Sequence, residues 1–158
     1  MASEQTPAKP SPIPDGATHA VPYLIVRGAA DALTFYQRAF GAVETIRIEM
    51  EGGVIGHAEL FIGRAELALA EEFPSMGIVG PQTLGGTSVG IGIYVEDVDT
   101  FTERAVAAGA KLLKPILDEF YGERVAQLED PFGHRWYFKS RFEEVSREEM
   151  LRRAAHGG

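Results

Sequence analysis

The stretch from residue 21 to residue 42 reads VPYLIVRGAADALTFYQRAFGA, and its pattern changes from strand to helix within a few residues. Residues 19–26 are apolar and β-compatible, which is typical of a strand. Residues 29–40 carry a broad apolar stripe at helical spacing, and Gly41 stands where a helix commonly ends on glycine. Downstream, the residue pattern predicts three further strands, at 43–48, 54–62 and 65–70. This part of the chain therefore forms one strand, one helix and three more strands.

The same order returns in the second half of the chain. Residues 87–96 predict a strand, residues 98–108 predict a helix with one apolar face, and Gly109 follows as its end. Three more strands are expected at 112–117, 123–129 and 135–141. An internal repeat predicts two structural units of one type. We expect an α+β fold in which two tandem βαβββ modules form a curved mixed sheet or cup, with the helices on its outer face.

Three segments lie outside the repeated units. Residues 1–18 are rich in proline and small polar residues, which predicts a disordered N-terminal arm. Ser146 and Glu149 form a capping box, which predicts a short helix near the C-terminus. The expected boundaries are a domain at 19–141, divided into module one at 19–70, a linker loop at 71–86 and module two at 87–141, followed by a C-terminal helix and tail at 142–158.

Composition and charge exclude several classes of partner. The chain has 158 residues, 15 Lys+Arg and 23 Asp+Glu, which gives a formal net charge of −8. Nucleic acids and anionic membrane surfaces are not expected partners, because both require clustered cations. The absence of cysteine excludes disulfides, thiolate nucleophiles and cysteine-based zinc sites. No stretch is typical of a signal peptide or a membrane span, so a cytoplasmic domain is expected.

The repeated unit resembles the vicinal oxygen chelate superfamily, and most closely its glyoxalase-like, bleomycin-resistance-type subgroup. The stretches that carry this resemblance are 21–42, HAEL at 57–60, TLGGTSVGIGIYVEDVD at 83–99 and YGERVAQLEDPFGHRWYF at 121–138. The superfamily also includes glyoxalase I and extradiol dioxygenases. The resemblance implies that each module forms half of a cup with a substrate or metal inside, and that the protein is a homodimer.

Alternate residues of a strand share a face, and this identifies the candidate site. His57 and Glu59 share one face of their strand and could form an acid–base pair, or a hydrogen-bonded pair that only stabilises the sheet. The other candidate ligand-binding residues expected in the cup are Tyr23, Phe61, Gly90, Gly92, Tyr121, Arg124, Arg135 and Tyr137. For Arg124 and Arg135 the alternative is a surface ion pair, and for Phe61 it is packing.

The resemblance also places the metal-ligand positions of the superfamily on this chain. They fall at Val21, Glu59, Gly90 and Tyr137, and of these only Glu59 is a metal ligand. Neither a metal nor another cofactor is therefore expected, and glyoxalase I or dioxygenase activity is not expected either.

The first functional hypothesis is the binding of a small, partly aromatic or planar molecule, and an acidic chain suits a cationic ligand. One alternative is a metal-independent isomerase or lyase that uses His57 and Glu59. A second is a metal enzyme with rearranged ligands, His57 and Glu59, with His19 as a candidate third ligand. A third is an interaction protein whose cup is filled by its own side chains. A small molecule and a second copy of the chain are the expected partners.

Overall fold

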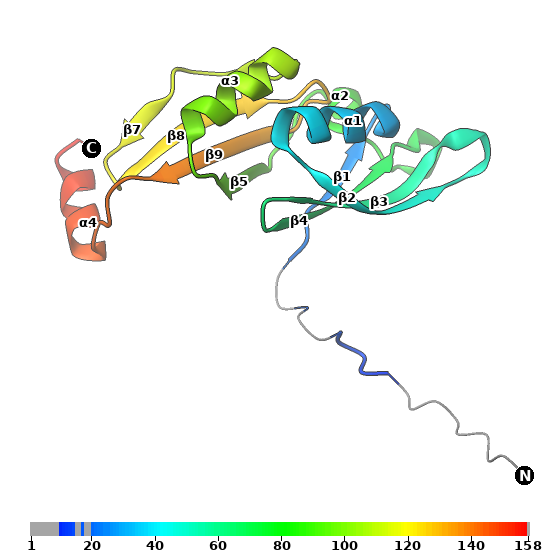
Figure 1. The fold of residues 1–158 in the computed structure, drawn as a ribbon, viewed down its shortest axis with the longest axis horizontal. Coiled ribbons are helices and arrows are strands. Elements are labelled where there is room, and N and C mark those ends of the chain that lie inside the picture. The colour runs from blue at the N-terminus through cyan, green and yellow to red at the C-terminus, as the bar shows by residue number, and fades with distance from the viewer. Residues whose placement is uncertain (1–9, 15–16, 18–19, 158) are drawn as a thin grey trace, which may run out of the picture.

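The computed structural model describes residues 10–14, 17 and 20–157. Two mixed sheets lie side by side, with helices on one side of them, and the repeated βαβββ order is confirmed (Figure 1). Most of the expected N-terminal arm at 1–18 lies outside the described residues. Within the described ranges, no helix is both long and apolar enough to cross a membrane.

Module one follows the predicted order closely. Its elements are β1 (Tyr23–Val26), α1 (Ala29–Phe40), β2 (Val43–Glu49), β3 (Ile55–Ile62) and β4 (Ala65–Glu71). The sheet order is β1-β4-β3-β2, with β1 parallel to β4 and the other pairs antiparallel. α1 ends at Gly41 with a φ of +66°, a left-handed conformation that glycine adopts without strain.

Module two repeats this plan, but its second strand is broken into two short strands. Its elements are β5 (Gly90–Tyr94), α3 (Val98–Ala108), β6 (Lys111–Leu112), β7 (Leu117–Glu119), β8 (Glu123–Glu129) and β9 (Arg135–Arg141). The sheet order is β5-β9-β8-β6, and β7 also pairs with β8. The prediction of one strand at 112–117 is wrong, because Pro115 has no N–H to donate within this stretch. The connection between the modules contains a 3₁₀ turn at Pro74–Met76 and the short helix α2 (Pro81–Leu84).

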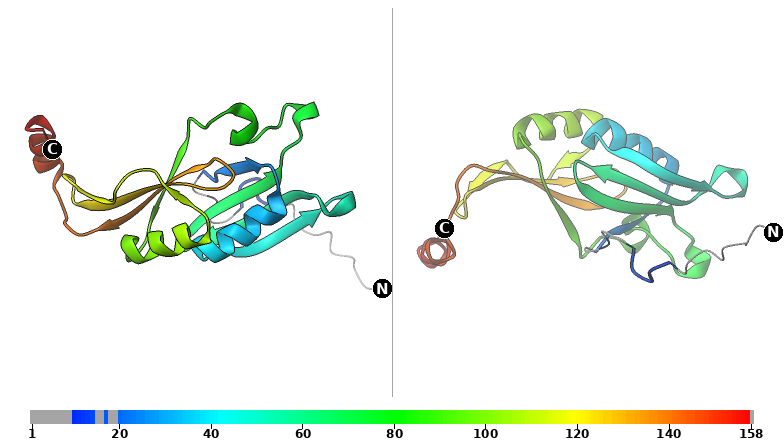
Figure 2. Two further views of the ribbon diagram at one scale, coloured as in Figure 1. Left: turned by 90° about the horizontal axis from the view of Figure 1, so that it is seen from above. Right: turned by 60° about the horizontal axis from the view of Figure 1, so that its bottom comes forward.

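A single hydrophobic core joins the two modules. α1 and α3 lie next to each other over the two sheets (Figure 2). Tyr36 of α1 and Trp136 and Phe138 of β9 are fully buried between them. Because both helices contribute to one core, the modules form one folding unit rather than two separate domains.

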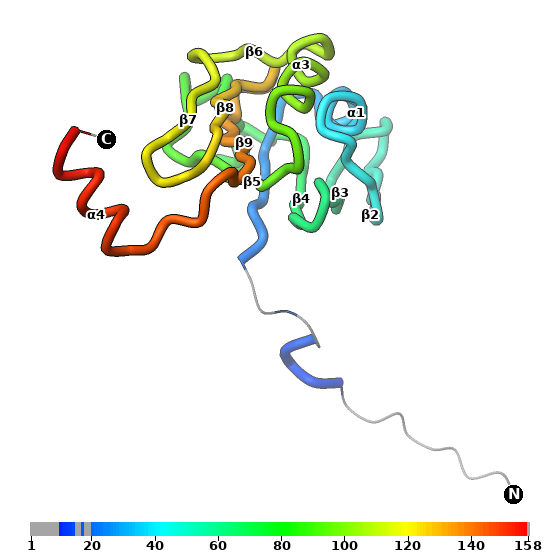
Figure 3. The backbone as a smooth tube through the Cα atoms, turned by 60° about the vertical axis from the view of Figure 1, so that its left-hand side comes forward, coloured from blue at the N-terminus to red at the C-terminus, as the bar shows by residue number. Residues whose placement is uncertain are grey.

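The C-terminal helix α4 (Arg147–Ala155) stands apart from this core (Figure 3). The hydroxyl of Ser146 accepts a hydrogen bond from the N–H of Glu149 at 3.2 Å, which confirms the predicted start of the helix. Arg153 donates to the carbonyl of Phe120 at 3.0 Å and pairs with Glu143 at 2.7 Å. None of the residues of α4 is buried, so the helix is attached to its own chain mainly through Arg153.

The sheet faces opposite the helices are open. In β2, Ile46 and Ile48 project from the same face as His57 and Glu59 of β3 and are 44% and 55% exposed. In β5, Tyr94 is 59% exposed on the corresponding face of module two. The two sheets do not close into a cup within one chain (Figure 2).

Candidate functional site

Three side chains of module one meet on its open sheet face. Tyr23 lies on β1 and His57 and Glu59 lie on β3, with β4 between the two strands. Ala68 of β4 is in register with both Tyr23 and Glu59. Because Ala68 carries only a methyl group, the ring of Tyr23 can extend across β4 to His57. The two rings stack with their centroids 5.5 Å apart and their planes at 28°.

A continuous hydrogen-bond chain links these groups. The hydroxyl of Tyr23 lies 3.0 Å from Nδ1 of His57, and Nε2 of His57 lies 3.2 Å from Oε1 of Glu59. A carboxylate only accepts hydrogen bonds, so we assign the ring hydrogen to Nε2, and Nδ1 then accepts from the Tyr23 hydroxyl. The side chains of His57 and Glu59 are 28% and 33% exposed, which leaves them accessible from the open face.

The groups that remain free at this site are acceptors. Both nitrogens of His57 are engaged, but the oxygen of Tyr23 keeps acceptor capacity, and the structure shows no partner for Oε2 of Glu59 among the described residues. The arrangement can therefore hold a group that donates hydrogen bonds. It can also move a proton along Tyr23, His57 and Glu59, because each is within hydrogen-bond distance of the next.

Apolar surfaces flank the polar chain on two sides. Phe61 of β3 lies on the same face, and so do the exposed Ile46 and Ile48 of β2. On the other side, Tyr23 lines a groove of about 500 Å³ that the segment 79–88 and His134 complete. Its apolar lining residues are Ile25, Val79, Pro81 and Leu84. This groove has the size of a small-ligand site.

The glycines of β5 have a different role from the one expected of them. A Cβ added at Gly90 would lie 2.2 Å from Cε2 of Tyr137, so the ring of Tyr137 fills the space above this glycine. Gly92 has more room, since a Cβ added there would lie 3.5 Å from Cε of Lys139. Gly90 therefore serves to seat Tyr137 on the open face of module two.

The two arginines expected in the cup form ion pairs. Arg124 pairs with Asp99 of α3 at 2.7 Å and with Asp118 at 2.8 Å, on the helix side of the sheet. These carboxylates raise the pKa of Arg124. Arg135 lies 3.7 Å from Glu129. The structure thus places Arg124 away from the open face, in the ion-pair arrangement that was the alternative.

A second polar cluster lies on the open face of module two. Glu123 is buried and accepts a short hydrogen bond from the hydroxyl of Tyr94, while Nζ of Lys139 lies 3.3 Å from its other oxygen. The hydrogen bond to Glu123 raises the pKa of Tyr94. The pKa of Tyr121 is raised by burial and by the charges of Glu119 and Glu123. Glu123 was not among the predicted site residues, although the alternation of β8 places it on this face.

Comparison with known proteins identifies the family. A model of the glyoxalase/bleomycin resistance protein/dioxygenase superfamily matches residues 16–138. The chain belongs to this superfamily. The uncharacterized protein Mb0911c of Mycobacterium bovis is 38% identical over 132 residues, which cover 82% of this chain and 87% of that protein.

Solved structures of the superfamily have the same fold. TioX from Micromonospora sp. ML1 is 28% identical and superposes with a TM-score of 0.63, covering 78% of this chain and 98% of TioX. The fosfomycin resistance protein FosX from Listeria monocytogenes, crystallised with Mn(II) and sulfate, is 21% identical with a TM-score of 0.61. That likeness covers 87% of this chain and 98% of FosX.

Two candidate metal ligands, His57 and Glu59, lie side by side on the open face of module one. Among the residues that the structure describes, no three His, Asp or Glu side chains come together in a metal-binding group. His57 and Glu59 bond to each other, and the position on β5 is Gly90. Transition-metal sites in enzymes usually have three protein ligands or more. His19, the third ligand considered above, lies outside the described residues.

Proposed function

We propose that this chain binds a small organic molecule with an apolar, planar body and a hydrogen-bond donor such as an amine or an amidine. The observation that carries the proposal is the chain from Tyr23 through His57 to Glu59. Each of its groups is held by the next, so the free oxygen of Glu59 has a fixed position before a ligand arrives. Pre-organised polar groups of this kind fix the orientation of a ligand.

The surroundings of Glu59 favour a ligand with a positive charge over a ligand with a negative charge. The ligand's donor would lie at Oε2 of Glu59, and its apolar body would lie against Tyr23 and in the groove beside it. The net charge of the chain is −8, which attracts cations over a longer range. A carboxylate ligand would instead be repelled by the carboxylate of Glu59.

We also propose that a second copy of the chain covers this face. Four large apolar side chains are exposed along β2 and just beyond it: Val43, Ile46, Ile48 and Met50. A contiguous apolar patch on the surface indicates an interface. The patch borders His57 and Glu59, so the copy that buries it also encloses the ligand.

The test is a titration with 2-naphthylmethylamine, a planar amine, followed by calorimetry and by NMR chemical shifts. We expect saturable binding with the largest shifts in β1 and β3. Glu59→Gln should weaken binding about tenfold, because a charge-assisted hydrogen bond is lost. Glu103→Gln removes the same charge on the exposed outer side of α3 and should leave the affinity unchanged.

Two results would contradict this proposal. One is equal affinity of the wild type and Glu59→Gln. The other is a set of shifts that spares β1 and β3 at saturation.

Proton transfer is the second candidate function, and the same hydrogen-bond chain supports it. Glu59 orients and polarises His57, whose other nitrogen faces the Tyr23 hydroxyl. This is a geometry suited to a metal-independent isomerase or lyase, with His57 and Glu59 as the acid–base pair. The variant Glu59→Gln distinguishes the two functions. If the chain is an enzyme, this variant retains part of its substrate binding and loses turnover. If the chain is a binding protein, neither the wild type nor the variant has turnover.

A further inference from the structure

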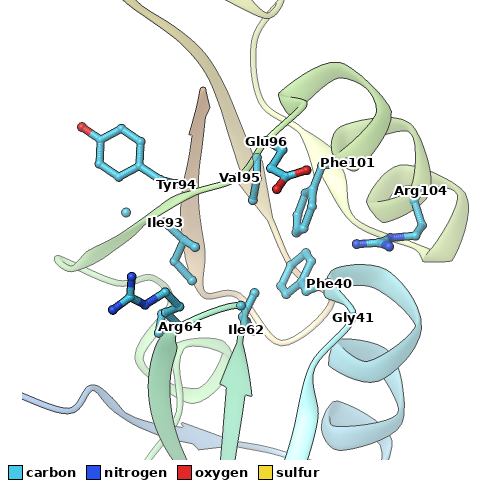
Figure 4. A pocket seen from close by; sticks show the side chains of 13 residues that line it. Phe40, Gly41, Ile62, Arg64, Ile93, Tyr94, Val95, Glu96, Phe101 and Arg104 are labelled. Carbon is cyan, nitrogen blue, oxygen red and sulfur yellow. The ribbon is translucent and has the colours of Figure 1, made fainter. Parts of the chain in front are cut away.

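A separate cavity lies where the two modules meet, and residues of both helices and both sheets line it. It has a volume of about 830 Å³ and is formed by the end of α1, the β3–β4 turn, β5 and the beginning of α3 (Figure 4). None of its lining residues belongs to the Tyr23–His57–Glu59 site. Its size is within the range of small-molecule pockets.

The floor of this cavity is apolar and partly aromatic. Phe40 and Phe101 stack with their ring centroids 5.8 Å apart and their planes at 18°. Ile62 and Ile93 lie beside them and are buried. A flat apolar group could extend this stack from the open side, because aromatic rings favour offset stacking.

Two arginines stand at the rim of the apolar floor. Arg104 of α3 donates through Nε to the carbonyl of Ala39 at 3.0 Å, and its guanidinium lies 5.0 Å from the ring centroid of Phe101. These contacts hold the guanidinium over the floor and leave its terminal NH₂ groups available. Arg64, in the β3–β4 turn, is exposed and forms no ion pair or hydrogen bond with the residues that the structure describes. In Figure 4 the two side chains come from opposite sides of the opening.

Cations at this position are unusual for a chain with a net charge of −8. Many of its other arginines are neutralised, as Arg124 and Arg153 are by two carboxylates each. We propose that the cavity binds an amphipathic monoanion, an aryl or short alkyl carboxylate whose body lies on Phe40 and Phe101 and whose charge lies between Arg64 and Arg104. Arginine suits this role because its planar donors match a carboxylate.

Glu96 limits the charge that the ligand can carry. Its carboxylate lines the same cavity on the side of Phe101 (Figure 4). A second negative charge on the ligand would be repelled by it. The cavity therefore selects a single anionic group attached to an apolar body, which is the opposite of the ligand class proposed for Glu59.

The test is a calorimetric and NMR titration of the full chain with 2-naphthoate, the carboxylate counterpart of the amine used above. We expect saturable binding, with shifts at the end of α1, the β3–β4 turn and β5. Arg64→Gln and Arg104→Gln should each weaken binding about tenfold, as expected when a charge-assisted hydrogen bond is lost. Glu96→Gln should strengthen it. Arg38→Gln, on the exposed face of α1, is the matched control and should change nothing.

Three outcomes would overturn the proposal. They are the absence of saturable binding of 2-naphthoate at millimolar concentrations, wild-type affinity in both Arg64→Gln and Arg104→Gln, and competition between 2-naphthoate and 2-naphthylmethylamine for the cavity. Arg64 lies in an exposed turn and supports no other described side chain, so its variant keeps the test valid even if Arg104→Gln reduces stability.

Discussion

The hydroxyl of Tyr36 in α1 donates a hydrogen bond to Oδ2 of Asp130 across 2.7 Å and so joins module one to the β8–β9 turn of module two. Nε1 of Trp136 donates to the same oxygen at 2.9 Å, and the N–H groups of Phe132 and His134 donate to the other. Asp130 is only 4% exposed, so its carboxylate depends on these four donors. The buried carboxylate of Asp130 therefore adds a polar connection to the hydrophobic core that joins the two modules.

Substitution of Tyr36 or Asp130 should lower the free energy of unfolding, and the loss should be larger for Asp130. Burial, followed by the charge of Asp130, raises the pKa of Tyr36 well above its usual value, so the hydroxyl remains a donor at neutral pH. Tyr36→Phe should lower the free energy of unfolding by about 1.5–3 kcal/mol, the range for a hydrogen bond to a charged group. Asp130→Asn should cost more, because asparagine offers one acceptor oxygen and leaves two donors unpaired at about 1–3 kcal/mol each.

Urea denaturation of the two variants measures this order. A loss in Asp130→Asn smaller than that in Tyr36→Phe would contradict the role given to the carboxylate.

The contact between Gly90 and Tyr137 predicts opposite behaviour for two neighbouring glycines. A methyl group at Gly90 would overlap the ring of Tyr137, whereas one at Gly92 would be in ordinary contact with Lys139. Gly90→Ala should therefore destabilise by about 1–3 kcal/mol, as overpacking does. Gly92→Ala is the control and should be neutral or slightly stabilising. Thermal unfolding of both variants checks this prediction. Equal melting temperatures of Gly90→Ala and Gly92→Ala would contradict the inference that Gly90 makes room for the ring of Tyr137.

The hydrogen bonds of Glu72 predict that the connection between the modules becomes less stable in acid. It accepts from Thr83 at 2.7 Å, from Arg27 at 2.8 Å and from the N–H of Gly80 at 3.1 Å. These bonds, that of Thr83 first, lower the pKa of Glu72 from 4.5 to about 2. A lowered pKa in the folded state means that the stabilisation is complete above pH 4.5 and is lost as the pH falls towards 2.

The measurement is the melting temperature against pH for the wild type, Glu72→Gln and Glu103→Gln. The difference between the wild type and Glu72→Gln should shrink as the pH falls through this window. A constant difference would show that the charge of Glu72 contributes nothing.

The exposed patch on β2 predicts how the chain assembles. Ile48→Glu places a charge within the patch and should convert the dimer proposed above into a monomer. It should also weaken the binding of 2-naphthylmethylamine, because the site then remains open. Val106→Glu is a suitable control, since Val106 is 43% exposed on α3, away from the patch. Sedimentation analysis of both variants measures the assembly, and an unchanged mass for Ile48→Glu would contradict the assigned interface.

Much of the fold is predictable because local sequence patterns determine its helices and strands. The bounds of α1 and α3 match the prediction residue for residue, since glycines end both helices and each has an apolar face. The apolar residues of 112–117 predict one strand, but Pro115 lacks the N–H that a continuous ladder needs, and two short strands form instead. The start of α1 shows a different limit: its first N–H groups bond to the carboxylate of Glu71, which is distant in sequence.

The site is predictable only in part, because some of its contacts join residues that are distant in sequence. Alternation along a strand places His57 and Glu59 on one face, where the structure has them within hydrogen-bond distance of each other. The bond from Tyr23 depends on Ala68 in the strand between them, which only the strand order reveals. The direction of Arg124 and the cavity between the modules depend on tertiary packing, and no local pattern encodes either.

The most direct test of the proposed site is the ¹⁵N NMR spectrum of the His57 ring during titration with 2-naphthylmethylamine. The free protein should show hydrogen on Nε2, the ring nitrogen that faces the carboxylate of Glu59. Saturation should shift both ring nitrogens, and Glu59→Gln should reduce the shift at the same concentration of amine. Ring nitrogens that stay unchanged while the amine binds would place the ligand elsewhere and contradict the proposed site.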